Sequence, residues 1–441
     1  MYENLGGDKK KMKMKMLVLV GIAACVLLLT SPALASAGYS KIYGNANEDD
    51  ILDMRDVTYI KLVIFGKKPA TTFADANYDG KISMLDVGQT KLIILGKEKT
   101  LTIVDIGDRT VTVPRPIERV VSCALPCTRV IVALEGCDQL VGSEFSRTPG
   151  VPSIGPCIGE LAFACDGEIL EKVTNVGWGS AVNAELIVSL KPDVIIAGRV
   201  ANADALQEKT DVPVVTGRYQ GYLGGPGFYN QIELIGTVLG KEKEAEELIL
   251  YMKEKIAEVT DVTSEIPNSK KPRVYFAARD GGRMGGFTKT GYYDAIDLAG
   301  GINVAKDCPL FDTYCEFDVS KEQIIAWNPD IILQKCHTSN PPSATQITIE
   351  DILEDPLLQT VNAVKNGSVY YCGATARGYP IQRYIPETMY FAKLFHPEKF
   401  KDLNLEKEGN EVMERFFKAD GLYTWYADET GWLRDFIESQ E

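Results

Sequence analysis

Histidine is almost absent from this sequence: its 441 residues contain 2, His337 and His396. A site that holds bare zinc or manganese usually needs several imidazole ligands, so such a site is not expected. Basic residues are also scarce, because 47 Lys and Arg stand against 61 Asp and Glu, which gives a formal net charge of -14. Since Lys and Arg must neutralise phosphates in complexes with nucleic acids, this balance argues against a nucleic-acid partner.

Motifs of several enzyme classes are missing as well. The sequence has no Gly-x-Ser-x-Gly nucleophile elbow, no Walker phosphate loop, and no histidine beside a plausible catalytic neighbour. We therefore expect a binding protein without catalytic activity. With 45% hydrophobic residues, the chain is long enough for two or three globular units.

Apolar runs long enough to span a bilayer are missing after residue 29. Before it, five lysines between positions 9 and 15 precede the apolar run Met16 to Leu29, and Ala33-Leu34-Ala35 follows. This order is typical of a secretory signal peptide. We expect a signal peptide over residues 1–35 and an exported protein, extracellular or on the cell surface. Lipidation at Cys25 and an uncleaved membrane anchor remain open.

Nine cysteines follow the expected cleavage point, and an odd number cannot all pair within one chain. In an exported protein, Cys157 with Cys165 and Cys308 with Cys315 are the nearest disulfide candidates by sequence. Sequence spacing alone does not establish the connectivity.

A twelve-residue acidic loop occurs twice, at residues 45–56 and 75–86, and an apolar helical pattern follows each copy. Side-chain oxygens at loop positions 1, 3, 5, 9 and 12 and the backbone carbonyl at position 7 form the shell that Ca²⁺ prefers. Gly80 permits the sharp turn at position 6, whereas Asp50 has to adopt it at a steric cost. We therefore expect the second loop to be the better formed. The predicted calcium ligands are Asn45, Asn47, Asp49, Asp53, Asp56, Asp75, Asn77, Asp79, Lys81 (through its carbonyl), Ser83 and Asp86.

Residues 36–97 resemble a dockerin domain, whose two loop-helix repeats carry Asp at position 12, as Asp56 and Asp86 do here. The resemblance implies a small all-α module that binds Ca²⁺ and a cohesin-like partner. In that family the residues at loop positions 10 and 11 contact the cohesin. Here they are Met54, Arg55, Met84 and Leu85. An acidic, turn-rich linker is the alternative interpretation of either loop alone.

From Leu101 onward, short β-rich runs alternate with helical stretches, which predicts an α/β fold with mostly parallel sheets. Between two clusters of strands, residues 241–260 have an apolar face typical of an amphipathic helix, which could connect two lobes. The predicted strands cover residues 118–122, 192–196, 213–215, 273–276 and 329–333.

The two halves of this region repeat one motif. A helix that starts with a glutamate leads to Pro192-Asp193 and a strand in the first half, and to Pro329-Asp330 and a strand in the second. With Arg119-Val-Val-Ser-x-x-x-Pro126, residues 298–304 and residues 363–370, these motifs resemble the iron-siderophore and cobalamin class (class III) of periplasmic binding proteins. That resemblance implies two Rossmann-like lobes, at residues 101–230 and 267–441, and a connector helix region at 231–266.

The resemblance also implies a partner and a ligand. In that family one glutamate on each lobe docks on arginines of an ABC importer's permease, and the corresponding residues are Glu185 and Glu322. The ligand, an iron chelate (siderophore or haem) or a corrinoid, lies between the lobes. The alternative role of each glutamate is to complement the positive end of its own helix, where Ser320 and Gln323 form a predicted capping box.

Ligand groups in open α/β sheets lie in the loops after the strand C-termini. Guanidinium groups there suit carboxylate, catecholate or phosphate oxygens. Trp178, Tyr222 and Tyr292 are candidate flat surfaces for an aromatic chelator. The predicted ligand-binding residues are Arg199, Arg218, Tyr219, Arg279, Arg283, His337 and Arg377.

Two other functions are compatible with the sequence. The dockerin-like module could belong to a carbohydrate-active enzyme, because paired carboxylates for glycoside hydrolysis are too common in sequences to exclude. It could also belong to a surface scaffold component of an extracellular polysaccharide-degrading assembly. The repeated Pro-Asp motif and the connector helix favour the solute-binding protein.

Overall fold

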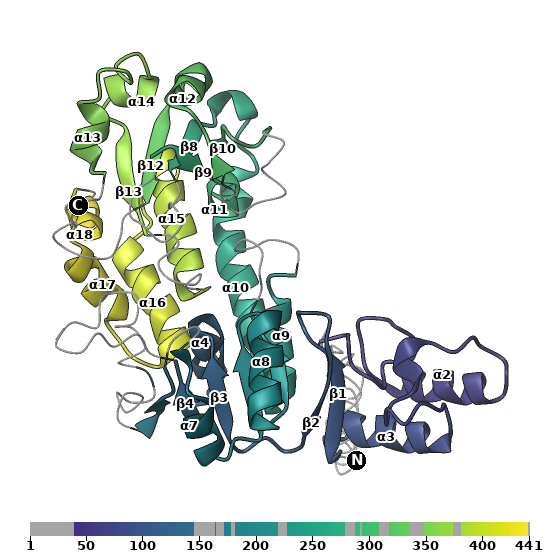
Figure 1. The fold of residues 1–441 in the computed structure, drawn as a ribbon. Coiled ribbons are helices and arrows are strands. Elements are labelled where there is room, and N and C mark those ends of the chain that lie inside the picture. The colour runs from purple at the N-terminus through teal and green to yellow at the C-terminus, as the bar shows by residue number, and fades with distance from the viewer. Residues whose placement is uncertain are drawn as a thin grey trace, which may run out of the picture.

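The computed structural model describes residues 39–144, 164, 172–177, 181–218, 227–277, 287–291, 293–307, 317–335, 347–373 and 381–439. Two lobes, each built on a parallel sheet, lie one above the other, and long helices run between them (Figure 1). A small helical module projects from the side of the first lobe (Figure 1). None of the described helices is long and apolar enough to cross a membrane.

The first lobe contains a five-stranded parallel sheet in the order β5-β4-β3-β6-β7. Its strands β3 to β7 are Val120–Cys123, Leu140–Ser143, Thr174–Asn175, Val194–Ala197 and Val214–Thr216. Its helices are α4 (Leu125–Ala133), α7 (Ala184–Ser189), α8 (Val200–Thr210) and α9 (Asn230–Leu239). The three strands predicted here are confirmed. Each begins one or two residues later than predicted, because the Pro or charged residues at its predicted start lie before the strand.

The second lobe contains a four-stranded parallel sheet in the order β10-β8-β12-β13. These strands are β8 (Arg273–Ala277), β10 (Ile302–Asn303), β12 (Ile331–Lys335) and β13 (Val369–Cys372). A short antiparallel pair, β9 (Lys289–Thr290) with β11 (Phe317–Asp318), lies beside the sheet. The helices of this lobe are α11 (Asp294–Leu298), α12 (Lys321–Trp327), α13 (Ile349–Leu353) and α14 (Asn362–Lys365), with the short turns η4 (Asn268–Lys270) and η5 (Ile381–Arg383).

The repeated Pro-Asp motif has the same structural role in both lobes. The Asp193 carboxylate accepts hydrogen bonds from the backbone of Glu118 and Arg119, at 2.8 Å each, where the chain enters β3. The Asp330 carboxylate likewise accepts one from the Arg273 amide at 3.0 Å, at the start of β8. Each aspartate thus fixes the start of the neighbouring central strand, which explains why the motif occurs in both halves.

The predicted connector is the helix α10 (Glu242–Thr263), which contacts α9 of the first lobe and α11 of the second. A second long helix, α16 (Leu405–Phe417), contacts α15 of the second lobe and α4 of the first lobe. Lys255 on α10 is 9% exposed and forms ion pairs with Glu408 at 2.8 Å and Glu411 at 2.9 Å on α16. The lobes are therefore joined by two helices that are tied to each other, and not by α10 alone.

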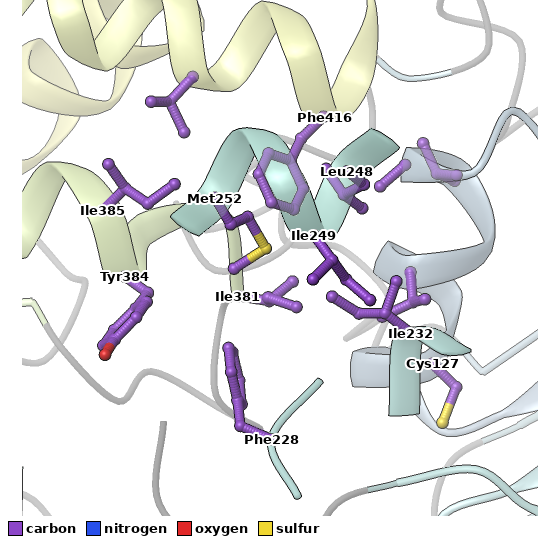
Figure 2. Close-up of a cluster of buried hydrophobic side chains, with 14 of the residues drawn as sticks. Cys127, Phe228, Ile232, Leu248, Ile249, Met252, Ile381, Tyr384, Ile385 and Phe416 are labelled. Carbon is purple, nitrogen blue, oxygen red and sulfur yellow. The ribbon is translucent and has the colours of Figure 1, made fainter. Parts of the chain in front are cut away.

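One hydrophobic core is continuous across the boundary between the lobes. Figure 2 shows part of it, with side chains from α4, α9, α10, α15 (Tyr384–Phe395) and α16 gathered in one cluster. The labelled members are Cys127, Phe228, Ile232, Leu248, Ile249, Met252, Ile381, Tyr384, Ile385 and Phe416. The chain ends in α17 (Leu422–Thr430) and α18 (Trp432–Glu438), which pack on the same core through Tyr426 and Leu433.

A hairpin attaches the small module to the first lobe. Strands β1 (Thr100–Val104) and β2 (Thr110–Pro114) pair antiparallel, and Ile42 bridges to Ile103 beside them. Tyr39 and Ile42 belong to the same core as the first lobe, and the Tyr39 hydroxyl donates to the Val104 carbonyl at 2.5 Å. The module is thus packed on the lobe through side chains as well as through the backbone.

Within the module, the two copies of the loop adopt nearly the same hydrogen-bond pattern. Each leads into a helix, α2 (Met54–Ile64) or α3 (Met84–Ile94), with the 3-10 turn η1 (Thr72–Ala74) between them. In the first loop the Asp56 carboxylate accepts from the amides of Asn47 at 3.1 Å and Asp53 at 2.8 Å. In the second loop Asp86 accepts from Asn77 at 3.1 Å and Ser83 at 2.7 Å. The sequence repeat is therefore a repeat of local structure.

The expectation about Asp50 was wrong. Gly80 has a φ of +85°, but position 6 of the first loop avoids the left-handed region, and both loops instead place position 4 there, Glu48 and Tyr78 at +56°. A residue with a Cβ atom is disfavoured at positive φ, so the first loop takes a different path around Asp50.

Candidate functional site

Each sheet has a topological switch point, a place where the strand order reverses so that successive strands are added on opposite sides. In open α/β proteins, ligands bind outside the strand C-termini at such switch points. In the first sheet this point lies between β3 and β6, which end at Cys123 and Ala197. In the second sheet it lies between β8 and β12, which end at Ala277 and Lys335. The candidate site is the region outside these strand ends, at the boundary between the lobes.

The C-terminal edges of the two sheets lie toward each other at the lobe boundary. Helix α4 begins directly after β3 and contacts the turn η5, which comes after β13 of the other lobe. On the same side, the rings of Phe228 and Tyr384 lie 5.6 Å apart between centroids (Figure 2). Elements that follow strands of both lobes are therefore in contact at the lobe boundary.

Arg218 lies at the switch point of the first lobe. A Cβ atom placed on Gly198, just after β6, would lie 3.7 Å from Arg218 Cδ and 3.1 Å from the Ala124 side chain just after β3. The 3.1 Å distance would crowd Ala124, whereas 3.7 Å is an ordinary contact, so these distances place the half-buried Arg218 beside the ends of the two central strands. Of the two predicted ligand residues that the structure describes, Arg199 and Arg218, Arg218 is the one whose side chain lies beside the ends of both β3 and β6.

A carboxylate that the sequence analysis missed lies beside it. Glu144 follows β4, is 7% exposed, and its Oε1 accepts a hydrogen bond from the Leu125 amide at 2.7 Å. Leu125 is the first residue of α4, and the N-cap residue Ala124 has no side chain that could serve this amide. Glu144 therefore caps α4 from another strand and places a negative charge at the positive end of the helix.

Two buried cysteines lie between these charges. Burial, together with a smaller effect of the nearby Glu144 carboxylate, raises the pKa of the Cys123 thiol to about 12. Burial also raises the pKa of Cys127, an effect that Arg218 opposes. Both groups are therefore neutral thiols at physiological pH. Cys137 is in a disulfide, and the predicted pairs Cys157 with Cys165 and Cys308 with Cys315 lie outside the described residues.

The second lobe contributes a buried group of charges around Glu387 on α15. The Tyr293 hydroxyl donates to Glu387 Oε2 at 2.9 Å, and the Arg383 guanidinium lies 3.8 Å from the centre of the Tyr426 ring. Burial raises the pKa of Glu387 to about 7, against the opposing effects of Tyr293, Arg383 and Lys335. Lys335 is the last residue of β12 and is 7% exposed. The second switch point therefore carries charge of both signs, like the first.

Among the other predicted ligand residues, the structure describes only Arg199. Arg199 is exposed at the N-cap of α8, with no side-chain capping bond. Tyr219, Arg279, Arg283, His337 and Arg377 lie outside the described residues, as do Trp178, Tyr222 and Tyr292. Lys335 could have been found in the sequence, since it lies two residues after the predicted strand 329–333. No predicted strand leads to the other three charged residues, Glu144, Arg383 and Glu387. Their places in the site depend on how elements distant in sequence pack together.

Glu185 and Glu322 occupy equivalent positions, in the first turns of α7 and α12, and both are exposed. These helices lie at opposite ends of the molecule (Figure 1). Hydrogen bonds with its own backbone amide and with Ser320 lower the pKa of Glu322, so it is ionised at neutral pH. Ser320 accepts from the Gln323 amide at 3.2 Å, which is one half of the predicted capping box.

The two acidic loops differ in the ion pairs that their carboxylates form. In the first loop Arg55 forms ion pairs with Asp49 at 3.1 Å and Asp53 at 2.9 Å, whereas Leu85 stands at the equivalent position of the second. The buried Asn45 keeps its Oδ1 without a hydrogen-bond partner, as a calcium ligand at position 1 would. Among the described residues, no three His, Cys, Asp or Glu side chains are already gathered as a metal site.

The known proteins that resemble this chain are binding proteins. Residues 159–376 match the model of a family described as periplasmic binding protein. The molybdate-binding protein MolA of Haemophilus influenzae is 28% identical over 346 residues, which are 72% of this chain and 91% of that protein. A cobalamin-binding protein of Halobacterium salinarum is 23% identical over 224 residues, 51% of this chain and 58% of that protein.

Solved structures have the same fold. A periplasmic solute binding protein of Veillonella parvula superposes with a TM-score of 0.53 and 26% identity, covering 72% of this chain and 93% of that one. The two-lobed part of the chain therefore has the α/β fold of the periplasmic solute-binding proteins.

Proposed function

We propose that this protein is the exported solute-binding component of an ABC importer and that it delivers an iron chelate or a corrinoid to the permease. The observation that carries the proposal is that both lobes have buried or half-buried charged side chains after or near their strand ends, Arg218 and Glu144 on one lobe and Lys335 and Glu387 on the other. Similarity to a cobalamin-binding protein and to a molybdate-binding protein supports a small metal-containing ligand.

The proposed organisation follows the sequence repeat and the two sheets. It comprises a signal peptide (1–35), a dockerin-like module (36–97), a first lobe (101–230), a connector region (231–266) and a second lobe (267–441). Export to the extracellular side or the cell surface is part of the same proposal.

Ligand binding is tested by titrating the full-length protein with cyanocobalamin, haem, ferric citrate and a ferric catecholate in a calorimeter. We expect one of these to bind, and Arg218→Met to weaken the affinity for that ligand at least about tenfold, because a half-buried guanidinium can hold oxygen ligands bidentately. Arg199→Met, on the exposed rim, should have a smaller effect. The matched control is Lys209→Met, an exposed change on α8 that should leave affinity unchanged. Absence of binding by the unmodified protein would refute the proposal.

Permease docking is a separate step and needs a separate readout. We propose that Glu185 and Glu322 contact arginines of the permease, since both are exposed and stand at equivalent positions of the two lobes. Glu185→Ala combined with Glu322→Ala should abolish ligand uptake while ligand affinity stays unchanged. The control pair is Glu208→Ala with Glu254→Ala, two exposed glutamates on α8 and α10. Equal uptake by both double variants would contradict docking through these residues.

We also propose that the two acidic loops bind Ca²⁺ through the oxygens predicted from the sequence. The unpartnered Oδ1 of Asn45 and the fully buried carboxylates of Asp56 and Asp86 fit this cation, because a hard oxygen-rich shell is what it requires. Native mass spectrometry should find two calcium ions. Asp79→Ala should remove the tighter one and Asp49→Ala the weaker, since Arg55 competes for the first loop. Melting temperatures that do not respond to a chelator would contradict the proposal.

A tethering role for the module is supported by its exposed apolar side chains. Met54, Met84 and Leu85 are 54%, 59% and 66% exposed at the starts of α2 and α3, the positions that a cohesin-like partner would contact. Leu85→Asp should weaken binding to an immobilised cohesin, with Leu357→Asp, an exposed leucine on the second lobe, as the control. This surface also suits the alternative function as a component of an extracellular polysaccharide-degrading assembly. Turnover of a polysaccharide by the purified protein would favour that alternative.

A further inference from the structure

A groove of about 1160 Å³ lies between the small module and the first lobe. One side is lined by the first acidic loop and the end of α3, and the other by residues that precede β3 and β4 and by the turn between α9 and α10. The groove therefore lies at the N-terminal edge of the first sheet, opposite the edge that carries the candidate ligand site. Pockets for small molecules usually measure about 300–1,000 Å³, so a stretch of polypeptide suits this groove better.

Part of the lining is apolar and open to solvent. Leu95, the C-cap residue of α3, is 64% exposed, and Ile93 and Ile94 before it are half-buried. Ile51 and Leu52 of the first loop are half-buried as well. Covering such side chains with a partner removes apolar surface from water and favours binding. None of the exposed side chains at the cohesin-contacting positions lines the groove, so it is a separate surface.

The charged side chains of the lining are mainly acidic, with six carboxylates against two cations, Arg115 and Lys241. Arg115 is already paired with Glu98 at 2.8 Å and with Glu242 at 3.0 Å. One guanidinium thus faces two carboxylates, which leaves Lys241 as the remaining cation of the lining.

Three further carboxylates of the lining are exposed, one on the module and two on the first lobe. They belong to Asp50, Glu118 and Asp138, and none of them forms an ion pair within the part of the chain that the structure describes. Exposed carboxylates are ionised at neutral pH. Negative charge therefore faces the groove from both of its walls, beside the apolar side chains.

We propose that this groove binds a segment of a partner protein in which apolar side chains alternate with lysine or arginine, and that the segment contacts the module and the first lobe together. Complementary charge favours such a segment over an acidic one, because like charges across an interface are repelled. The exposed Leu95 favours it over a purely polar basic segment. The inference is independent of the chelate site, which lies at the other edge of the sheet.

The test is a fluorescence-anisotropy titration of the full-length protein with labelled synthetic peptides of equal length. One peptide alternates leucine with lysine, the second leucine with glutamate, and the third serine with lysine. We expect the first to bind, the second not to bind, and the third to bind at least about tenfold more weakly than the first, because it has no apolar side chains to bury.

Charge reversal in the groove should weaken the leucine-lysine peptide. We expect Glu118→Lys combined with Asp138→Lys to lower its affinity at least about tenfold. The matched control is Glu254→Lys with Glu350→Lys, two exposed glutamates on α10 and α13, which changes the net charge equally and should leave the affinity unchanged.

The apolar contribution is tested at Leu95. Leu95→Ser should lower the affinity for the leucine-lysine peptide at least about threefold, whereas Leu357→Ser, an equally exposed leucine on the second lobe, should not. Circular dichroism checks that the variants are folded, and Asp50→Lys with Asp138→Lys provides a second charge reversal if the first pair does not fold.

Absence of binding of the leucine-lysine peptide by the unmodified protein would overturn the inference. An equal loss in the groove and control charge reversals would also overturn it, because the acidic protein would then attract any cationic peptide. Equal affinity for the leucine-lysine and serine-lysine peptides would overturn it as well. Binding of a chelate, which decides the proposed function, is read in a separate titration.

Discussion

The strongest stability prediction concerns Arg115, which ties the hairpin to the rest of the first lobe. Its Nε lies 2.8 Å from Glu98 Oε1 and its Nη2 lies 3.0 Å from Glu242 Oε1. The remaining nitrogen, Nη1, donates to the backbone carbonyls of Thr237 at 2.7 Å and Val238 at 3.1 Å. The side chains of Arg115 and Glu98 are 10% and 3% exposed, so this pair is buried.

Replacing Arg115 with methionine keeps much of the volume and removes every one of these bonds. The Glu98 carboxylate would then remain buried without a counter-charge, and its second oxygen already has no hydrogen-bond partner. Breaking a buried ion pair on one side costs about 3–5 kcal/mol. We expect Arg115→Met to lower the free energy of unfolding by about that amount in urea denaturation followed by circular dichroism.

The double variant Arg115→Met with Glu98→Leu should recover most of the loss, because a buried pair replaced by apolar side chains is often close to neutral. A surface control is Lys41→Met, which breaks the 2.8 Å pair with Asp108 whose side chains are 45% and 80% exposed. That change should cost less than about 1 kcal/mol. A loss below about 1 kcal/mol in Arg115→Met, or no recovery in the double variant, would refute the reasoning.

Three further results are expected. Lys255→Met should lower the free energy of unfolding by about 2 kcal/mol or more, measured in urea, since Glu408 on α16 loses its buried partner. Because burial raises the pKa of Glu387 to about 7, the native state keeps a proton that the unfolded state releases near pH 4. Stability should therefore fall as the pH rises from about 4 to about 7, and Glu387→Gln should reduce that slope by up to about 1.4 kcal/mol per pH unit. Finally, Cys123 and Cys127 should react slowly with iodoacetamide at pH 8 in the native protein and rapidly in urea, because their buried thiols stay protonated.

Much of the fold was accessible from the sequence because it depends on local patterns. The two Pro-Asp motifs predicted two equivalent halves, and the structure gives Asp193 and Asp330 the same role at the starts of β3 and β8. The apolar face of residues 241–260 predicted a connector helix, which is α10. The second crossing helix, α16, was missed, since its contact with α10 depends on the ion pairs of Lys255 with residues more than 150 positions away.

The candidate site was less accessible, for a physical reason. Loops after strands can be recognised from the strands that precede them, and Arg218 was found in that way. Glu144 also follows a strand, but its significance depends on the amide of Leu125, which belongs to another connection. Glu387 lies in the interior of α15 and becomes part of the site only because Tyr293 and Lys335 pack against it. Contacts of this kind, between residues far apart in the sequence, cannot be predicted from sequence spacing.

The packing of the small module changes what a tether would do to the binding lobes. Tyr39 and Ile42 share the core of the first lobe, and the side chain of Asp50 lies close enough to Glu233 on α9 to help raise its pKa to about 7, an effect due mainly to burial. Helix α9 leads directly into α10, which crosses to the second lobe. A partner that holds the module would therefore also fix the orientation of the first lobe.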